Sequence, residues 1–404
     1  MKPLVQLVVL GGGMIGKTIA YFAEREGWDV VLVDPFLTKE QLDTDPIFHR
    51  SVNGGVSSHR VDFIQYDGFR YVEDHEFAPG TYFMNTMPVY DPFRVCNLVS
   101  RIRSIGGHYL DISEDLSCSL QLEKMNREHR GNLIAPHCGL APGLSTVIAA
   151  NMARVYPNLQ SIRINVGALP VNVDNPYGYY PTWSPEGLVN EYSNNNLCIE
   201  NWNRVERVPD FTKTRNVVIE GITYESCATS GGLGTMVRSY AETSPIPTSL
   251  EYRTLRYPGH WAMIHQILMP DIIDLELDRP FKTPSFTVSE GGKRELLQVM
   301  KDSRAEGTDA DRVLIHVEVS GRNTSGQNRV SRYTRVVQGR NPFLAIQLTT
   351  AFGPLLVIDS HAKKLLPNRY LAQEEIIITD GIEQSPFNWL YGNPSVLLGS
   401  GISM

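Results

Sequence analysis

Residues 4–34 constrain the fold more than any other stretch of the chain. They read LVQLVVLGGGMIGKTIAYFAEREGWDVVLVD, which is an apolar strand ending at Leu10, a glycine turn, a helix with apolar residues at helical spacing, and a second strand closing on Asp34. The turn has the spacing G-x-G-x-x-G, in which the first glycine permits the tight turn and the second lets a pyrophosphate approach the backbone. The third lets the helix pack on the strand. The pattern predicts a dinucleotide-binding βαβ unit.

The acid at the end of the second strand bears on the choice of cofactor. A carboxylate at Asp34 can accept hydrogen bonds from the adenosine ribose, whereas the extra phosphate of NADP would meet a like charge there. We therefore expect NAD(H), the alternative being a Rossmann-like domain whose loop binds nothing. The expected cofactor contacts are Gly11, Gly13, Met14, Ile15, Gly16, Asp34, Asn85, Met87 and Pro88.

Composition narrows the class of protein. A chain of 404 residues exceeds the usual size of one core, so two domains are expected. A net charge of −7 argues against nucleic-acid binding. We expect neither a signal peptide nor a membrane span, since no apolar run of about 18 residues occurs. The five cysteines are scattered and indicate neither a zinc site nor another metal site, and for the four other than Cys138 we expect reduced cytoplasmic thiols.

Polar side chains follow several predicted strands. Strands are expected at 59–67, 81–86, 108–112 and 132–138, and Asp91 with Pro92 opens a helix after the second of these. Because parallel strands end at one edge of a sheet, the polar residues at these ends should border one crevice. They are Asn85 to Tyr90, Asp111, His137 and Cys138.

The pattern of residue types along the chain changes after the first domain. Residues 1–140 predict a doubly wound parallel sheet that binds the dinucleotide. Residues 141–340 alternate strands with loops rich in Pro, Asn and Tyr, which is typical of an inserted α+β domain with a mixed sheet. Residues 341–404 begin with a densely apolar helix, so we expect this segment to return to the Rossmann domain. The fold class is therefore α/β.

Three further motifs resemble one family. They are CGLAPGLSTVIAANM at 138–152, GALP with YGYYPTWSPEGLVNEY within 167–192, and YRTLRYPGH at 252–260. They resemble the saccharopine dehydrogenase-like oxidoreductases, and the chain looks closest to the shorter bacterial members, including lysine 6-dehydrogenase. The resemblance implies NAD(P)-linked conversion between an amine and an imine on a lysine-derived amino acid. It also implies a homodimer formed through the inserted mixed sheet.

Two departures from the family pattern shift the expected substrate. Glutamate-forming members usually have a basic residue just after the WSP-like segment, where this chain has Glu186, and an acid there suits an ammonium better than a carboxylate. Asp34 departs from the NADP preference of those enzymes. Both favour a cationic amine. The alternatives are a saccharopine- or carboxynorspermidine-type reductase that joins an amine to a carbonyl compound, and an NAD-binding regulatory protein without turnover.

Amine oxidation requires a group that accepts a proton from the nitrogen. Asp111 and Cys138 are the candidates, because both lie at strand ends and both match polar active-site positions of the resembling family. The alternatives are a helix N-cap for Asp111 and a small buried apolar residue for Cys138. His137 is a weaker candidate, since alternation along a strand would point it to the opposite face.

The remaining candidates are residues that we expect to contact the substrate. Tyr90 offers a hydroxyl, Trp183 and Ser184 form a wall of the pocket, and Arg256 offers a bidentate grip on a carboxylate. We expect His260 to be a further catalytic residue. The alternatives are packing of the aromatic residues, loop packing of Trp183 and Ser184, and pairing of Arg256 with an acid of the second domain.

Overall fold

The computed structural model divides the chain into two compact units. Unit 1 comprises residues 1–155, 234–236 and 339–404, and unit 2 comprises residues 156–233 and 237–338. The residues described here are 4–48, 50–52, 55–57, 61–88, 91–269, 288–305, 310–378, 382 and 384–390.

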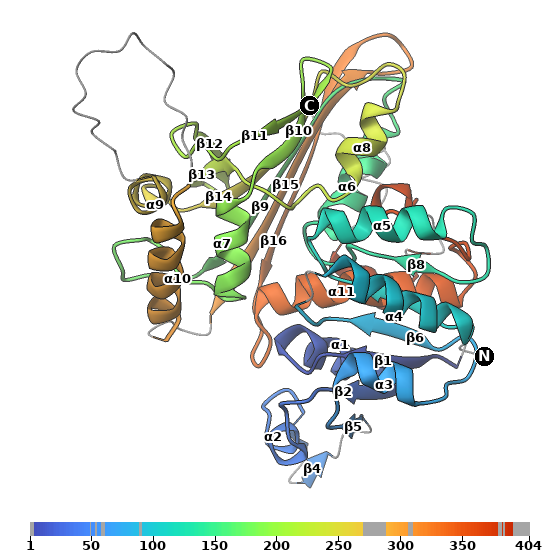
Figure 1. Ribbon diagram of the computed structural model, residues 1–404. Coiled ribbons are helices and arrows are strands. Elements are labelled where there is room, and N and C mark those ends of the chain that lie inside the picture. The colour runs from blue at the N-terminus through green and yellow to red at the C-terminus, as the bar shows by residue number, and fades with distance from the viewer. Residues whose placement is uncertain are drawn as a thin grey trace. The chain divides into compact units, whose positions relative to one another are not determined.

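Unit 1 is built on a parallel sheet of six strands (Figure 1). Its spatial order is β5-β2-β1-β6-β7-β8, and every pairing along that path is parallel. If the separate β3–β4 hairpin is set aside, this is the Rossmann order 3-2-1-4-5-6. The predicted fold class is confirmed. The strands are β1 (Gln6–Leu10), β2 (Asp29–Val33), β3 (Arg50–Val52), β4 (Gly55–Ser57), β5 (Asp62–Ile64), β6 (Tyr82–Asn85), β7 (His108–Asp111) and β8 (Ile134–Ala135).

Helices cover both faces of this sheet. Buried residues of α3, α4 and α5 share one apolar core with the strands, because the crossovers from β5 to β8 all run in the same direction across the sheet. The predicted start of α4 is present, since the Asp91 carboxylate accepts from the Phe93 amide and Pro92 is the first helical residue. The helices are α1 (Met14–Arg25), α2 (Lys39–Asp43), α3 (Gly68–Asp74), α4 (Pro92–Ser104), α5 (Leu116–Asn126), α6 (Leu144–Ala153), α11 (Ala345–Ala362), η1 (Gln373–Glu375) and η2 (Asn388–Leu390).

Helix α11 packs against α1. The ring centroids of Phe22 and Phe352 lie 4.8 Å apart, and the Gln347 amide donates to the Thr18 hydroxyl at 3.1 Å. Nearly every residue of α11 is buried, which explains why its sequence is apolar on all sides. The domain limits at 140/141 and 340/341 stay predictions, whereas packing divides the chain at 155/156 and 338/339 and assigns α6 to unit 1.

Unit 2 contains a mixed sheet of eight strands. Its main path is β11-β10-β14-β9-β15-β16, with β13 paired to β14 and β12 to β13, and only β14 and β9 run parallel. The strands are β9 (Asn158–Pro170), β10 (Asn196–Glu200), β11 (Asn203–Arg207), β12 (Arg215–Ile219), β13 (Ile222–Ala228), β14 (Ser249–Arg256), β15 (Asp311–Arg322) and β16 (Asn328–Gln338).

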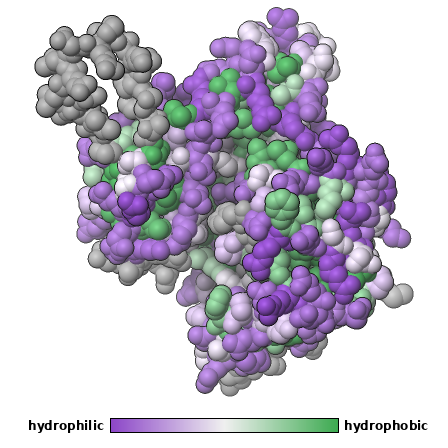
Figure 2. Space-filling view, viewed as in Figure 1, coloured by the Kyte–Doolittle hydropathy of each residue, from purple (hydrophilic) through white to green (hydrophobic). Residues whose placement is uncertain are grey.

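One face of the unit 2 sheet carries a ladder of ion pairs across neighbouring strands. Arg163 of β9 contacts Glu251 of β14 at 2.6 Å and Glu318 of β15 at 3.1 Å, and Arg332 of β16 contacts Glu318 at 2.7 Å. The other face packs on α7 (Pro185–Ser193), α9 (His260–Leu268) and α10 (Glu290–Ala305) around a core that includes Trp261. Helix α8 spans Met236–Ala241. On the face that Figure 2 shows, the described residues are mostly hydrophilic, with separate hydrophobic patches among them.

Candidate active site

The glycine turn between β1 and α1 has the conformation that its sequence predicts. Gly11 has φ of +108°, and a Cβ at Gly16 would lie 1.9 Å from the Gly11 carbonyl oxygen, so neither position tolerates a side chain. The Thr86 hydroxyl donates to the carbonyl oxygens of Leu10 and Gly11 at 3.1 and 3.0 Å and so fixes the turn from behind.

Gly13 forms the N-cap of α1 and is exposed. No described side chain caps this helix end, and no described heavy atom lies within 4 Å of a Cβ built on Gly13. The first amides of α1 therefore face outward with the positive end of the helix dipole, which is the arrangement that binds phosphate. Met14 and Ile15 are half-buried in the first turn. These residues fit a dinucleotide pyrophosphate.

Asp34 lies just beyond β2, beside the glycine turn. One oxygen of its carboxylate accepts from the Gly12 amide at 2.7 Å, and the other accepts from the amides of Phe36 and Leu37 at 2.8 and 2.9 Å. The carboxylate is therefore held in one orientation by the backbone. A half-buried acid in this place fits the ribose of an adenine dinucleotide.

The predicted contacts after β6 have different surroundings. Asn85 is buried, and its side chain accepts from the Met87 amide at 3.0 Å and donates to the Tyr109 hydroxyl at 3.2 Å. Met87 is half-buried against Gly68, where a Cβ would lie 2.9 Å from its sulfur, and Pro88 is exposed. Tyr90 lies outside the described residues, so its role stays a prediction.

A buried hydrogen-bond network joins the ends of β6, β7 and β8. The Tyr109 hydroxyl receives the bond from Asn85 and donates to Asp111 Oδ2 at 3.0 Å. Asp111 Oδ1 accepts from the amides of Ser113 and His137, both at 3.0 Å. We call Asn85, Tyr109, Asp111, Ser113 and His137 the strand-end network. It brings together polar residues that the sequence placed at successive strand ends.

Asp111 is an internal acceptor in this network. The N-cap of α5 is Asp115, so the alternative of a cap at Asp111 is wrong. Burial raises the pKa of the Asp111 carboxyl, and the electrostatic effect of the nearby His137 and the hydrogen bonds from the backbone oppose that rise. The residue is 3% exposed, and both carboxylate oxygens already accept hydrogen bonds. Its predicted role as acid or base stays a prediction.

Cys138 lies beside Asp111 and is 1% exposed. Its amide donates to the Asp111 carbonyl oxygen at 2.7 Å, its thiol donates to the Ala135 carbonyl at 3.1 Å, and Gln373 donates to its sulfur at 3.2 Å. Burial raises the pKa of the thiol well above its ordinary value, which is opposite to the shift that a thiolate base requires. This environment matches the alternative of a small buried residue.

Arg256 and His260 lie in the core of unit 2. The Arg256 guanidinium donates to the Tyr192 hydroxyl at 2.7 Å, lies 3.9 Å from Glu191 and stacks 4.4 Å from the Tyr179 ring. His260 contacts the Tyr192 hydroxyl at 3.0 Å, and burial with the Arg256 charge lowers its pKa to about 3. Arg256 thus has the acid partner that the sequence left as its alternative.

Trp183 and Ser184 also belong to unit 2. The Trp183 indole donates to the Tyr179 hydroxyl at 3.2 Å, and the Ser184 hydroxyl caps α7 by accepting from the Gly187 amide at 3.1 Å. The Glu186 carboxylate is largely exposed and pairs with Lys301 at 2.7 Å. Its charge is therefore balanced within unit 2, which weakens the argument for a cationic substrate that the sequence alone suggested.

Several members of these clusters were missed from the sequence. Tyr109 could have been predicted from the sequence, because it precedes Asp111 by two positions and strand alternation puts both side chains on one face of the strand. Gln373, Glu191 and Tyr192 come from distant segments, and nothing in the pattern of the chain connects them to Cys138 or Arg256.

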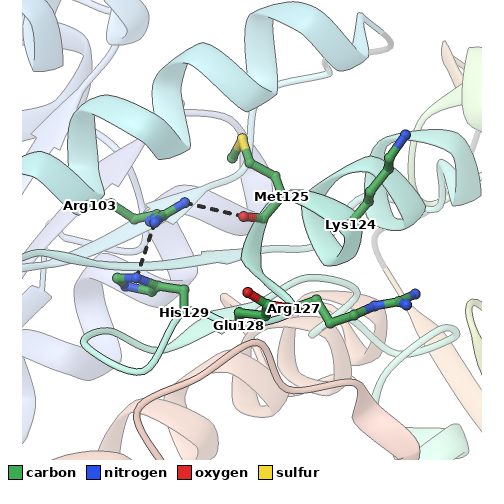
Figure 3. Close-up of a pocket in the computed structure, with 6 residues that line it drawn as sticks. All are labelled: Arg103, Lys124, Met125, Arg127, Glu128 and His129. Atoms are coloured by element: carbon green, nitrogen blue, oxygen red, sulfur yellow. Dashed lines mark hydrogen bonds between the residues drawn. The ribbon is translucent and has the colours of Figure 1, made fainter.

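Figure 3 shows a hollow on unit 1 that contains none of the residues of the strand-end network. The Arg103 guanidinium donates there to the Met125 carbonyl at 3.5 Å and to His129 at 3.1 Å. These residues lie in the last turns of α4 and α5 or just after α5, and both helices return to the amino ends of the strands, so the hollow is at the opposite edge of the sheet. It is lined by Arg103, Lys124, Met125, Arg127, Glu128 and His129.

The described residues contain no group of three His, Cys, Asp or Glu side chains arranged to hold a metal ion. Among the same residues, no helix has both the length and the apolar character that a membrane span requires.

The Rossmann sheet, its glycine turn and the acid after β2 place the chain in the class of Rossmann-fold proteins. The family model of the saccharopine dehydrogenase C-terminal domain matches residues 139–380, which is more than half of the chain. The chain belongs to the saccharopine dehydrogenase-like family of oxidoreductases.

One solved structure with this fold is similar to the chain over nearly its whole length. Apo saccharopine dehydrogenase (L-Glu forming) from Saccharomyces cerevisiae matches with a TM-score of 0.67 and 14% identity, over 96% of this chain and 98% of that one. A mutant meso-dapdh from Clostridium tetani, with bound DAP, matches over 96% and 99% of the two chains at 9% identity. Its TM-score of 0.42 is too low to support a structural argument.

Proposed function

We propose that this protein is an NAD-dependent oxidoreductase that converts an amine to an imine at the C–N bond of a lysine-derived amino acid or related amine. One observation carries the proposal. The sheet register pairs Leu10 with Asn85 and Asn85 with Asp111, so the glycine turn and the strand-end network share one edge of the unit 1 sheet. Ligands of open α/β sheets bind at that edge. Membership of the family supports redox chemistry there.

The cofactor half of the proposal rests on residues of the first βαβ unit. The outward amides at the start of α1 would hold the pyrophosphate, and the Asp34 carboxylate would accept from the ribose hydroxyls. A nicotinamide dinucleotide would supply the acceptor for the hydride. Because the like charge of Asp34 opposes a 2′-phosphate, we expect NADH to bind more tightly than NADPH in a fluorescence titration of the nicotinamide. Tighter binding of NADPH would reverse this choice.

Residues of the chain itself would orient the substrate and exclude water at the strand ends. Asn85, Tyr109 and Asp111 are each less than 5% exposed and hold one another by hydrogen bonds. A fixed and dry arrangement of this kind favours a reaction that needs a substrate carbon held against a ring and water excluded. Asp111 in turn holds the backbone at His137 and Cys138 in place.

A second candidate function is a reductase of the saccharopine or carboxynorspermidine type, which joins an amine to a carbonyl compound. The ion pair between Glu186 and Lys301 favours it, because the acid that would repel a second carboxylate has a cationic partner at 2.7 Å. This candidate uses the same cofactor edge. It differs from the first in the charge of its substrate.

One absorbance screen tests both candidates. Purified protein is incubated with NAD⁺ and a panel of amines that includes L-lysine, and separately with NADH, 2-oxo acids and amines. Formation of NADH with a free amine supports the first candidate, and consumption of NADH only with paired substrates supports the second. If NADH binds while no member of either panel is turned over, the protein is an NAD-binding regulator instead.

The proposal also includes a cytoplasmic homodimer formed through the mixed sheet of unit 2, as the resemblance implies. Sedimentation of the purified protein tests the assembly. A monomer at micromolar concentration would remove the dimer from the proposal and leave the chemistry unaffected.

A further inference from the structure

His137 has a conformation that differs from its strand context. Strand β8 ends at Ala135, and His137 has φ of +62°, in the left-handed region that few residues other than glycine adopt. Strained backbone of this kind persists where surrounding contacts hold it in place, and it is enriched at active sites. Two contacts hold it here, since the amide donates to Asp111 Oδ1 at 3.0 Å and ring Nδ1 lies 2.6 Å from the Ser113 carbonyl oxygen.

The contact to Ser113 determines which ring nitrogen of His137 carries hydrogen. A carbonyl oxygen only accepts, so Nδ1 must be the donor, and the Nε2 of the neutral ring is then an acceptor. The residue is 2% exposed, yet no described residue gives Nε2 a hydrogen-bond partner. A buried acceptor in this state costs free energy, which a polar ligand would recover.

The surroundings of the ring leave Nε2 buried and without a described partner. A Cβ at Gly234 would lie 3.2 Å from His137 Cδ2, the carbon next to Nε2, so a side chain at this position would crowd that ring edge. By contrast, both oxygens of Asp111 accept internal hydrogen bonds, and the thiol of Cys138 donates to Ala135. Within the strand-end network, the one acceptor without a described partner is Nε2 of His137.

We propose that Nε2 of His137 contacts the nitrogen of the amine substrate and takes up its proton. This inference rests on the proposed function. The substrate ammonium gives one proton to Nε2, and the neighbouring carbon loses its hydrogen with both electrons to NAD⁺. The substrate becomes an iminium ion, NAD⁺ becomes NADH, and the imidazolium later releases its proton to water. Asp111 acts as a positioning residue, because its carboxylate holds the amide of His137.

The substitution His137→Asn isolates the role of Nε2. Asparagine tolerates the left-handed backbone, and its amide group can replace Nδ1 as the donor to Ser113, but it has no group in the place of Nε2. The matched control is His129→Asn, since both ring nitrogens of His129 already have partners in Arg103 and Asn132 on the other edge of the sheet. We expect His137→Asn to lower kcat for the amine found in the screen by about 100-fold or more. The affinity for NADH should stay within a few-fold, and His129→Asn should leave both unchanged.

A second measurement on the unmodified protein does not need turnover. Nitrogen-15 NMR of protein labelled at its histidine rings reports the state of Nε2, and His137→Asn identifies the His137 signal. With NADH present, addition of the amine panel should move the Nε2 signal of His137. A moved signal without turnover of any amine would support the contact while sinking the proposed reaction.

Two results would overturn the inference. The first is amine turnover by His137→Asn within about three-fold of the unmodified protein, which would leave the proposed function standing without this residue. The second is a His137 Nε2 signal that no amine of the panel moves.

Discussion

The carboxylate of Asp111 holds the backbone of His137, because Oδ1 accepts the His137 amide at 3.0 Å across the gap between two strand ends. The same oxygen accepts the amide of Ser113, whose carbonyl in turn receives the hydrogen of the His137 ring. One buried acid therefore sets both the backbone and the ring of the neighbouring histidine.

Replacing that acid tests its importance for the fold. In Asp111→Asn, an amide NH₂ that faces the Tyr109 hydroxyl leaves the hydroxyl hydrogen without its acceptor, and one that faces the two backbone donors loses both of their bonds, so at least one buried donor loses its acceptor. We expect the free energy of unfolding in urea to fall by about 1–3 kcal/mol. Asp115→Asn is the control, because asparagine caps a helix about as well as aspartate. Equal stability of the two variants would contradict the assignment.

Two glycines of the phosphate turn should respond differently to alanine. Gly16→Ala puts a methyl group 1.9 Å from the Gly11 carbonyl, so thermal denaturation should show a loss of stability of more than about 1 kcal/mol. Gly13→Ala meets no described atom within 4 Å and should keep its stability, while NADH titration should show weaker binding because the methyl group occupies the approach of the pyrophosphate. Unchanged NADH affinity in Gly13→Ala would remove the cofactor from this turn.

Thiol labelling should distinguish the cysteines. Cys138 is buried with a pKa raised by burial, whereas Cys96 is half-buried on α4. Because the thiolate is the reactive form, iodoacetamide under native conditions should modify Cys96 first and leave Cys138 unmodified until the protein unfolds. Mass spectrometry of the digested protein locates the label. Rapid labelling of Cys138 under native conditions would support the hypothesis that it acts as a thiolate base.

Acid should destabilise unit 1 through His108. Burial, with the neighbouring His361, lowers the pKa of His108 to about 4 from an ordinary value of 6.5. The unfolded chain therefore binds the proton first, so the stability contributed by neutral His108 is complete above pH 6.5 and is lost as the pH falls toward 4. At about 1.4 kcal/mol per pKa unit, this amounts to about 3 kcal/mol.

The variant His108→Asn tests this pH dependence directly. The ring Nδ1 accepts from the Leu133 amide at 3.0 Å, and an asparagine oxygen can take that bond at any pH. Urea denaturation between pH 6.5 and 4 should therefore be less pH-dependent in the variant than in the unmodified protein. Parallel losses in the two proteins would assign the acid sensitivity to other groups.

Local patterns predicted the parts of the fold that depend on local contacts. The glycine turn, the acid after β2 and the N-cap of α4 follow from neighbouring residues, and each is where the sequence placed it. The prediction for His137 assumed that strand alternation continued past Ala135. That assumption failed, because β8 ends there and the backbone turns left-handed.

Contacts between distant segments account for what the sequence did not reveal. The partner of Arg256 is Glu191 on α7, and the bond from Gln373 to Cys138 crosses most of the chain. Nothing in a single sequence ranks these pairs above other combinations of the same residue types. For the same reason, the balance of Glu186 by Lys301 became visible only once α7 and α10 were side by side.

The packing of α11 on α1 has a consequence for synthesis on the ribosome. Helix α1 leaves the exit tunnel before α11, which follows only after residues 156–338 have been made. The face of α1 that α11 covers therefore stays exposed while the whole inserted unit is translated, and chaperones would have their greatest effect on yield during this period.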